Sequence, residues 1–190
     1  LGGIVETRSK ETANHVLRVS EYSYLLALKI GLSEKESSLL RLSAPMHDVG
    51  KIGIPDAILN KPSSLTPKEY ELIKSHTTIG YDILKNSKRK ILQTASIVAL
   101  QHHEYWNGSG YPAGLKETDI HIFSRITGLA DVFDAVSCKR AYKKTWPQDK
   151  VYEFILEQKS HQFDPELVDV FLRDIHEFIA IKEKFADEYL

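Results

Sequence analysis

The sequence predicts an all-α fold, a compact helical bundle that forms a single domain over residues 1–190. Three observations predict it. Apolar residues recur with helical period along most of the chain, proline and glycine clusters fall between these periodic segments, and no segment alternates apolar and polar residues as a half-buried strand does. With 42% hydrophobic residues among 190, the chain can bury one substantial core.

Capping residues define the predicted helix starts. Ser33 with Glu36, and Thr66 with Glu69, form capping boxes, in which a hydroxyl and a carboxylate each bind a backbone amide of the first turn. Pro165 follows an acidic N-cap residue and opens the last helix. The predicted helices cover about 4–30, 33–48, 66–84, 88–103 and 123–142, a short segment after 147 and a final segment from 164.

A long loop is predicted between the helix that ends near residue 103 and the helix that starts near residue 123. Its first part, residues 104–114, contains Gly108, Gly110, Gly114 and Pro112, which are incompatible with a continuous helix or strand. The glycines permit tight backbone turns in this segment. We therefore expect an irregular but well-defined loop there.

Composition narrows the class of protein. The chain has 25 basic and 26 acidic side chains and a net charge of -1, so no global positive field favours a nucleic-acid polymer or an anionic membrane. The single cysteine, Cys138, excludes an internal disulfide framework and predicts a reducing, cytoplasmic setting. No apolar segment is long enough for membrane insertion. The start at Leu1 suggests a piece of a longer polypeptide.

Adjacent histidine and aspartate residues mark the first candidate metal site. His47 and Asp48 stand near the end of the second predicted helix, whose last turn we expect Pro45 to kink. An imidazole and a carboxylate in this position can reach two neighbouring cations. Alone, such a pair is more often a helix cap or a polar surface pair.

Further histidines and carboxylates occur on the other predicted helices. Glu11 and His15 are four residues apart on one helix face, where both side chains can bind one ion. Asp131 lies in an apolar run in which an uncompensated carboxylate would be costly, and Asp134 is placed to support it. Together with His76 and the His102–His103 pair, these residues predict a polynuclear metal site inside the bundle.

Four motifs in order resemble one known family. They are His47-Asp48-Val49-Gly50-Lys51-Ile52-Gly53-Ile54-Pro55-Asp56, His102-His103-Glu104, Gly110-Tyr111-Pro112 and Asp131-Val132-Phe133-Asp134-Ala135. The chain resembles the HD-GYP family from about residue 11 to 171. The resemblance implies a metal-dependent phosphodiesterase of bacterial signal transduction that hydrolyses cyclic di-GMP to linear pGpG, with GMP as a further product to be considered.

The resemblance also implies site residues. Asp48 would bridge a dinuclear centre, Lys51 would contact the phosphate, and both are the expected catalytic residues. Two or three divalent ions are expected, and histidine with carboxylate ligands favours iron or manganese. The implied metal ligands are Glu11, His15, His47, Asp48, His76, His102, His103 and Asp131, with Glu11 and His15 serving a third ion.

Substrate binding is assigned by resemblance to Lys51, Tyr111, Arg140 and Lys143, with the 110–112 loop bordering the active site. Ala141 stands where the family has proline, which removes a backbone restraint beside Arg140. Two alternatives stay open: a module that binds cyclic di-GMP without turnover, and an HD-type hydrolase of another cyclic dinucleotide. A protein partner at the 110–112 loop and a dimer are also considered. Because family members often follow sensory or receiver domains, the resemblance also implies such a domain before this chain.

Overall fold

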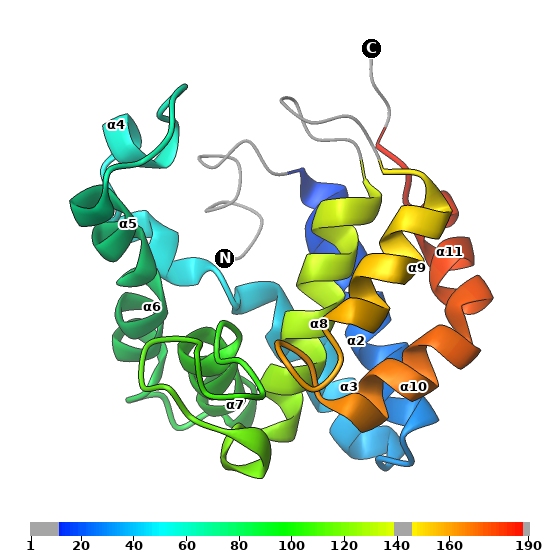
Figure 1. Cartoon of the computed structure of the whole chain (residues 1–190). Coiled ribbons are helices and arrows are strands. Elements are labelled where there is room, and N and C mark those ends of the chain that lie inside the picture. The colour runs from blue at the N-terminus through cyan, green and yellow to red at the C-terminus, as the bar shows by residue number, and fades with distance from the viewer. Residues whose placement is uncertain (1–11, 139–145, 188–190) are drawn as a thin grey trace.

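The computed structural model describes residues 12–138 and 146–187, and within these ranges the chain is helical and contains no β-strand (Figure 1). The predicted all-α class is confirmed. No helix in the described ranges is both long and apolar enough to cross a membrane. The α-helices are α2 (Ala13–Lys29), α3 (Glu34–Ser43), α4 (Asp56–Leu59), α5 (Pro67–Lys74), α6 (His76–Leu84), α7 (Lys90–Gln101), α8 (Ile122–Ser137), α9 (Gln148–Glu157), α10 (Pro165–Arg173) and α11 (Ile175–Lys184). The same ranges also contain the 3₁₀ helices η2 (Ala44–Met46), η3 (Val49–Gly53) and η4 (Glu117–Asp119).

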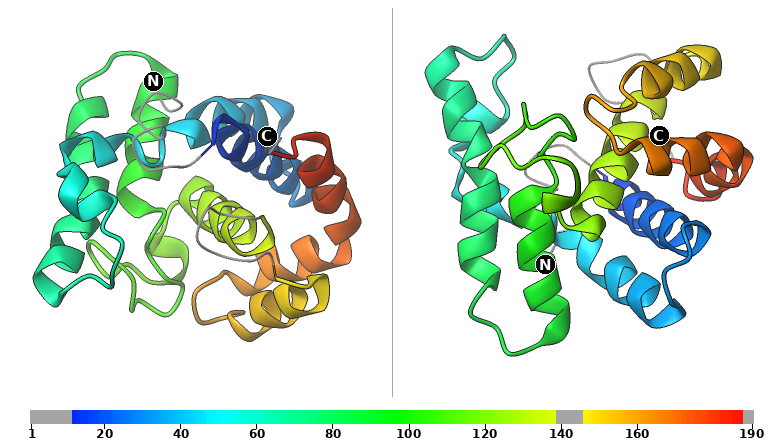
Figure 2. Two further views of the ribbon diagram at one scale, coloured as in Figure 1. Left: turned by 90° about the horizontal axis from the view of Figure 1, so that it is seen from above. Right: turned by 60° about the horizontal axis from the view of Figure 1, so that its bottom comes forward.

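Two hydrophobic cores divide the helices into two groups. The larger core lies among α2, α3 and α8 to α11, and Tyr22, Leu129 and Phe171 are among its fully buried residues. The smaller core, which includes Val49 and Ala99, lies among η2, η3, α6 and α7. Figure 1 and Figure 2 show α4 to α7 on one side of the molecule and α2, α8 and the C-terminal helices on the other. The segment from η2 to η3 passes between the two groups.

Local signals placed several helix ends correctly. Both predicted capping boxes are present: the Ser33 hydroxyl accepts from the Glu36 amide, and the Thr66 hydroxyl accepts from the Glu69 amide. The Asp164 carboxylate caps α10 by accepting from the Glu166 amide. The loop after α7 is also confirmed, with η4 as a single short turn within it.

Several predicted boundaries are wrong. For the helix predicted over 4–30, α2 begins at Ala13 because Thr12 is extended and its side chain caps the helix by accepting from the His15 amide. Residues 4–11 of that prediction lie outside the described ranges. The second ends at Ser43, since Pro45 enters a 3₁₀ turn in place of a kinked α-turn. The helix predicted over 123–142 ends at Ser137, where Cys138 becomes extended.

Two long predicted helices are each divided in two. The segment predicted from 66 to 84 is interrupted at Ser75, whose hydroxyl donates to the Leu72 carbonyl, so that α6 starts at His76. The final segment is interrupted at Asp174, between α10 and α11. The four-residue helix α4 was not predicted, because it lacks a side-chain cap and contains no periodic apolar stripe.

Candidate metal centre

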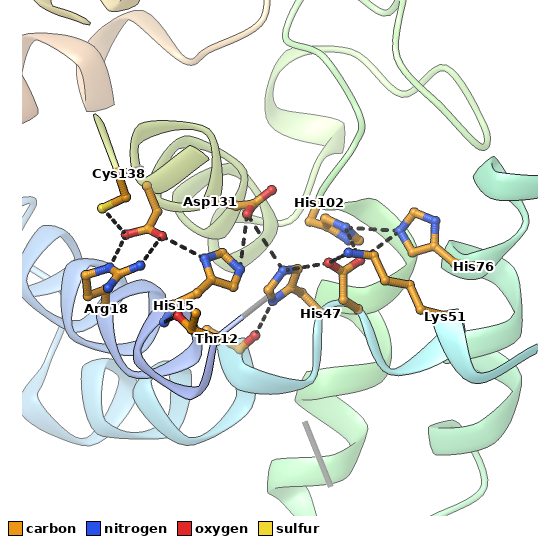
Figure 3. Close-up of polar contacts among 12 residues, drawn as sticks. Thr12, His15, Arg18, His47, Lys51, His76, His102, Asp131 and Cys138 are labelled. Carbon is orange, nitrogen blue, oxygen red and sulfur yellow. Dashed lines mark hydrogen bonds and ion pairs between the residues drawn. The ribbon is translucent and has the colours of Figure 1, made fainter. Parts of the chain in front are cut away.

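The predicted ligands that lie in the described ranges meet at the boundary between the two cores. His15 comes from α2, His47 and Asp48 from the turn between η2 and η3, and Asp131 from α8. His76 begins α6, and His102 and His103 follow the last turn of α7. Figure 3 shows the labelled side chains in a row that runs from Arg18 through His15, Asp131 and His47 to His102 and His76.

The four-residue cluster consists of Asp48, His76, His102 and His103. Each offers a ligand atom, and these atoms all lie within 4.8 Å of one another. Asp48 Oδ1 is 3.2 Å from His76 Nε2 and 3.7 Å from His102 Nε2. The two imidazole nitrogens of His76 and His102 are 3.4 Å apart. Three imidazoles and one carboxylate are a donor set that first-row transition metals accept.

The three-residue cluster consists of His15, His47 and Asp131, whose ligand atoms also lie within 4.8 Å of one another. Asp131 Oδ1 is 3.6 Å from His15 Nε2 and 3.9 Å from His47 Nε2. The two clusters adjoin, because His47 Nε2 lies 3.2 Å from the second oxygen of Asp48, Oδ2. Asp48 therefore presents one oxygen to each cluster, as a bridging carboxylate would.

The imidazole tautomers suit metal binding. His47 Nδ1 lies 2.9 Å from the Ala44 carbonyl, and His76 Nδ1 lies 2.7 Å from the Ile73 carbonyl. His102 Nδ1 lies 3.1 Å from two carbonyls of α7. Because a carbonyl only accepts, each Nδ1 carries the proton and each Nε2 keeps its lone pair. All three Nε2 atoms face Asp48 or its immediate surroundings, which is the arrangement that metal-ligating histidines adopt.

Protonation also favours cation binding. Burial acts to raise the pKa of the Asp48 carboxyl, but the Lys51 ammonium and the His47 imidazole outweigh burial and hold the pKa well below its usual range. Burial lowers the pKa of His102 and, together with neighbouring imidazoles, lowers the pKa of His103 further. Asp48 Oδ1 is buried and has no hydrogen-bond donor within the described ranges, which is rare for a carboxylate. A cation at this position would satisfy it.

Comparison with known proteins agrees with this geometry. A family model described as an HD domain matches residues 2–167. The chain belongs to the HD domain family. A 3'3'-cGAMP-specific phosphodiesterase 2 from Vibrio cholerae is 45% identical over 98% of this chain and 36% of its own length. A cyclic di-GMP phosphodiesterase from Thermotoga maritima is 43% identical over 99% of this chain and 51% of its own length.

A solved structure of Bd1817, an HDG"Y"P protein from Bdellovibrio bacteriovorus, superimposes with a TM-score of 0.66 at 27% identity, over 86% of this chain and 51% of that one. The HD-GYP resemblance is confirmed, and the HD domain with its histidine and aspartate clusters uses divalent metal. The chain spans between about a third and a half of the length of these relatives.

Glycine permits a close backbone contact that brings the four-residue cluster of the HD domain together. A Cβ on Gly50 would lie 1.8 Å from the His76 carbonyl oxygen and 2.5 Å from the Gly80 nitrogen. The His-Asp turn can therefore pack directly against the first turn of α6 only if residue 50 has no side chain. This contact places His76 opposite Asp48, although the two residues are far apart in sequence.

The glycine-rich loop covers His103. The Tyr111 ring stacks on the His103 ring with centroids 4.8 Å apart and an interplanar angle of 30°. The buried Glu104 carboxylate accepts from the amides of Ala113 and Leu115, and thereby closes the loop. A Cβ on Gly110 would lie 2.3 Å from the Tyr105 nitrogen, so the loop conformation requires glycine there. Glu104 stood in a recognised motif, but the sequence did not reveal its role.

Lys51 and Asp134 have contacts that the sequence did not specify. Lys51 Nζ lies 2.6 Å from Asp48 Oδ2, at the edge of both clusters, with its side chain 15% exposed.

Asp134 was expected to support Asp131, but its carboxylate instead contacts His15 and Arg18. Burial acts to raise its pKa, but these two contacts hold the pKa of Asp134 at about 2. The sequence did not indicate that Arg18 contacts the site, because arginine residues on helices are usually exposed at the surface.

Three predicted site residues lie outside the described ranges. They are Glu11, predicted as a ligand, and Arg140 and Lys143, predicted to bind substrate.

Proposed function

We propose that this HD domain is a phosphodiesterase that hydrolyses cyclic di-GMP to linear pGpG. The main support is the pair of adjoining clusters with Asp48 between them, because two-metal sites that act on phosphate esters have this arrangement. Two findings support cyclic di-GMP as the substrate: the Thermotoga maritima relative is named a cyclic di-GMP phosphodiesterase, and the chain resembles the HD-GYP family. We assign residues 1–190 to one catalytic domain that works in the cytoplasm.

We assign the metal ligands as the sequence predicted them. The four-residue cluster would hold one ion and the three-residue cluster another, with Asp48 bridging. Glu11 together with His15 would serve a third ion. The absence of sulfur from the described donor sets favours iron or manganese. Bound divalent ions would supply Lewis acidity, which activates water for attack and neutralises charge on the phosphate.

The chain's own residues would complete the reaction. Hydrolysis adds water across one P–O3′ bond: phosphorus gains the water oxygen, and the 3′ oxygen leaves with a proton. Lys51 Nζ, held at the edge of the clusters by Asp48, would bind a non-bridging phosphate oxygen and donate a proton to the leaving 3′ oxygen. Asp48 would thus act on both the ions and Lys51, which is why we assign catalytic roles to both residues.

Substrate contacts would come from the rim of the site. Tyr111 is fixed beside the clusters by its stack on His103, and the Lys74 ammonium lies 5.6 Å from its ring centroid. We assign the second phosphate and the guanine edges to Arg140 and Lys143. The 110–112 loop is exposed or half-buried, so it is also the surface we propose for a protein partner.

A second candidate substrate is 3'3'-cGAMP. It is favoured by the 45% identical relative, which is named as specific for that dinucleotide. Ala141, where the HD-GYP family has proline, lies between two of the assigned substrate residues and is a natural place for a change in preference. A binding module without turnover is disfavoured, because every predicted ligand in the described ranges lies in one of the two clusters.

The test combines metal analysis with product analysis. The 190-residue chain is purified without chelators, its metals are measured by elemental analysis, and cyclic di-GMP and 3'3'-cGAMP are followed separately by chromatography. Asp48→Ala is compared with Asp82→Ala, an exposed carboxylate on α6 that pairs with Lys85. We expect Asp48→Ala to lower hydrolysis by roughly three orders of magnitude, which corresponds to about 4 kcal/mol of transition-state stabilisation.

The outcomes separate the alternatives. Two or more ions per chain and linear pGpG from the wild type and from Asp82→Ala, with both lost in Asp48→Ala, would support the proposal. Turnover of 3'3'-cGAMP alone would replace the substrate. Bound metal without hydrolysis of either dinucleotide would favour the binding module. If the chain binds no metal, the assignment of the two clusters as metal sites is wrong.

A further inference from the structure

A buried arginine–carboxylate pair lies beside the three-residue cluster. Arg18 on α2 donates to both oxygens of Asp134 on α8, from Nε to Oδ1 at 2.6 Å and from Nη2 to Oδ2 at 2.9 Å. Both side chains are 2% exposed. This two-pronged geometry restricts the position and the plane of the carboxylate more than a single hydrogen bond would. Neither residue belongs to the predicted ligands.

Asp134 transmits this restriction to a predicted ligand. Its Oδ2 atom lies 2.8 Å from His15 Nδ1. Because both Asp134 oxygens accept from Arg18, the carboxylate is the acceptor for His15 as well, so the His15 proton resides on Nδ1. The opposite nitrogen, Nε2, then directs its lone pair towards Asp131, whose Oδ1 lies 3.6 Å away. His47, His76 and His102 use backbone carbonyls for the same purpose, whereas His15 uses a side chain.

Arg18 is itself held from the other side. Its Nη1 atom donates to the Phe185 carbonyl at 2.8 Å and to Asp187 Oδ2 at 3.1 Å, both in the segment that follows α11. The guanidinium therefore has carboxylate or carbonyl partners on two sides and little freedom to rotate. Removing two charges from water is costly, and a well-packed apolar pair would join α2 to α8 at least as stably. Stability alone is a poor reason to keep this pair.

We propose that Arg18 and Asp134 are positioning residues that set the tautomer and the orientation of His15, and thereby the metal affinity of the three-residue cluster. This inference rests on the proposed metal role of that cluster. Arg18 fixes Asp134, Asp134 fixes the imidazole, and the imidazole presents Nε2 beside Asp131. Within the described ranges, neither Arg18 nor Asp134 contacts a residue of the four-residue cluster, so the metal affinity of that cluster should depend on this pair far less.

The experiment measures metal binding without substrate. The 190-residue chain is stripped of metal and titrated with Mn²⁺ by calorimetry, and thermal unfolding is recorded for every variant. Asp134→Asn and Arg18→Gln should weaken Mn²⁺ binding at the three-residue cluster by about 10- to 100-fold, as loss of a group that orients a ligand typically does. Binding at the four-residue cluster should stay within about threefold of the wild type, since mutations without shared contacts act independently.

Two controls separate positioning from folding. Arg125→Gln breaks the pair between Arg125 Nη1 and Asp164 Oδ2, which are 2.5 Å apart and also largely buried. Arg125 lies on α8, the helix that carries Asp134, and Asp164 is the N-cap residue of α10. It should lower the melting temperature without changing either Mn²⁺ affinity. The double variant Arg18→Met with Asp134→Leu removes the charges together and keeps apolar packing, so it should remain folded and still lose affinity at the three-residue cluster.

Wild-type Mn²⁺ affinity at both clusters in the folded double variant would overturn the proposal. Equal loss at both clusters in the single variants would also overturn it, because the effect would then be a general loss of structure. His15→Ala tests the underlying assumption that His15 is a metal ligand. If this variant binds as many Mn²⁺ ions as the wild type, the three-residue cluster does not bind metal through His15. None of these results depends on which dinucleotide is hydrolysed.

Discussion

The two clusters are built from the same residue types but are held in place differently. In the four-residue cluster, His76 is oriented by a backbone carbonyl near the end of α5, and His102 is oriented by backbone carbonyls of α7. In the three-residue cluster, His15 is oriented by Asp134, a side chain from another helix that is held in turn by Arg18. Backbone support persists as long as the helices form. Side-chain support can be removed by one substitution, so the two clusters should respond differently to mutation.

The clusters also differ in exposure and in charge. The Asp48 side chain is 7% exposed and has Lys51 beside it, whereas the Asp131 side chain is 17% exposed. Because Asp48 contacts His47 as well as His76, any change at Asp48 should affect both clusters. Changes that act on one cluster alone must be made further from this shared carboxylate.

Gly50→Ala should have the largest effect on stability, because it disrupts the backbone contact that brings the four-residue cluster together. The new Cβ would lie 1.8 Å from the His76 carbonyl oxygen, so either the turn that carries Asp48 or the start of α6 must shift. We expect the free energy of unfolding to fall by about 3 kcal/mol, measured by urea denaturation of the metal-free chain. Gly53→Ala in the same segment is the control: its Cβ would meet only the Ile79 side chain, at 3.0 Å, and should cost less than about 1 kcal/mol. Equal losses in the two variants would contradict the close-contact argument.

Asp131→Asn should separate the clusters functionally. The amide keeps the size of the side chain but loses the charge that faces His15 and His47. We expect the three-residue cluster to lose its ion and hydrolysis to fall by roughly a hundredfold, or about 2.7 kcal/mol, while one ion remains bound. Elemental analysis and chromatography of the same preparation provide both values. Loss of all metal would mean that the two clusters bind as one cooperative unit.

The pH dependence of stability should be the smallest of these effects. In the metal-free protein, burial lowers the pKa values of His102 and His103, so the folded state keeps them neutral while the unfolded chain takes up protons below a pH of about 6.5. Since the unfolded state then binds more protons, the free energy of unfolding decreases as the pH falls below that value. Each histidine contributes up to about 1.4 kcal/mol per pH unit.

Urea denaturation of the metal-free chain between pH 7.5 and 5 tests this prediction. The slope should become smaller when His102 and His103 are both replaced by glutamine. A stability that stays constant over this range in the wild type would show that these imidazoles are accessible to protons in the folded state.

Local chemistry explains which parts of the fold were predictable. The capping boxes at Ser33 and Thr66 act within a single turn, so the pattern of residues is sufficient to locate them. The break at Ser75 was not predictable, because apolar periodicity continues across it and a serine inside a helical pattern does not by itself mark a helix end. The helix start at Ala13 was misplaced because apolar spacing outweighed the N-cap signal of Thr12.

The sequence by itself determined the helical class, the loop after α7 and the identity of the candidate ligands, because these depend on residue type, spacing and order. Only the tertiary structure decided that the ligands form two adjoining clusters joined by Asp48, since each cluster brings together segments that are far apart in the sequence. The same holds for the role of Arg18. Its partner Asp134 is 116 positions away in sequence, and no local pattern encodes a contact that arises only when α2 packs against α8.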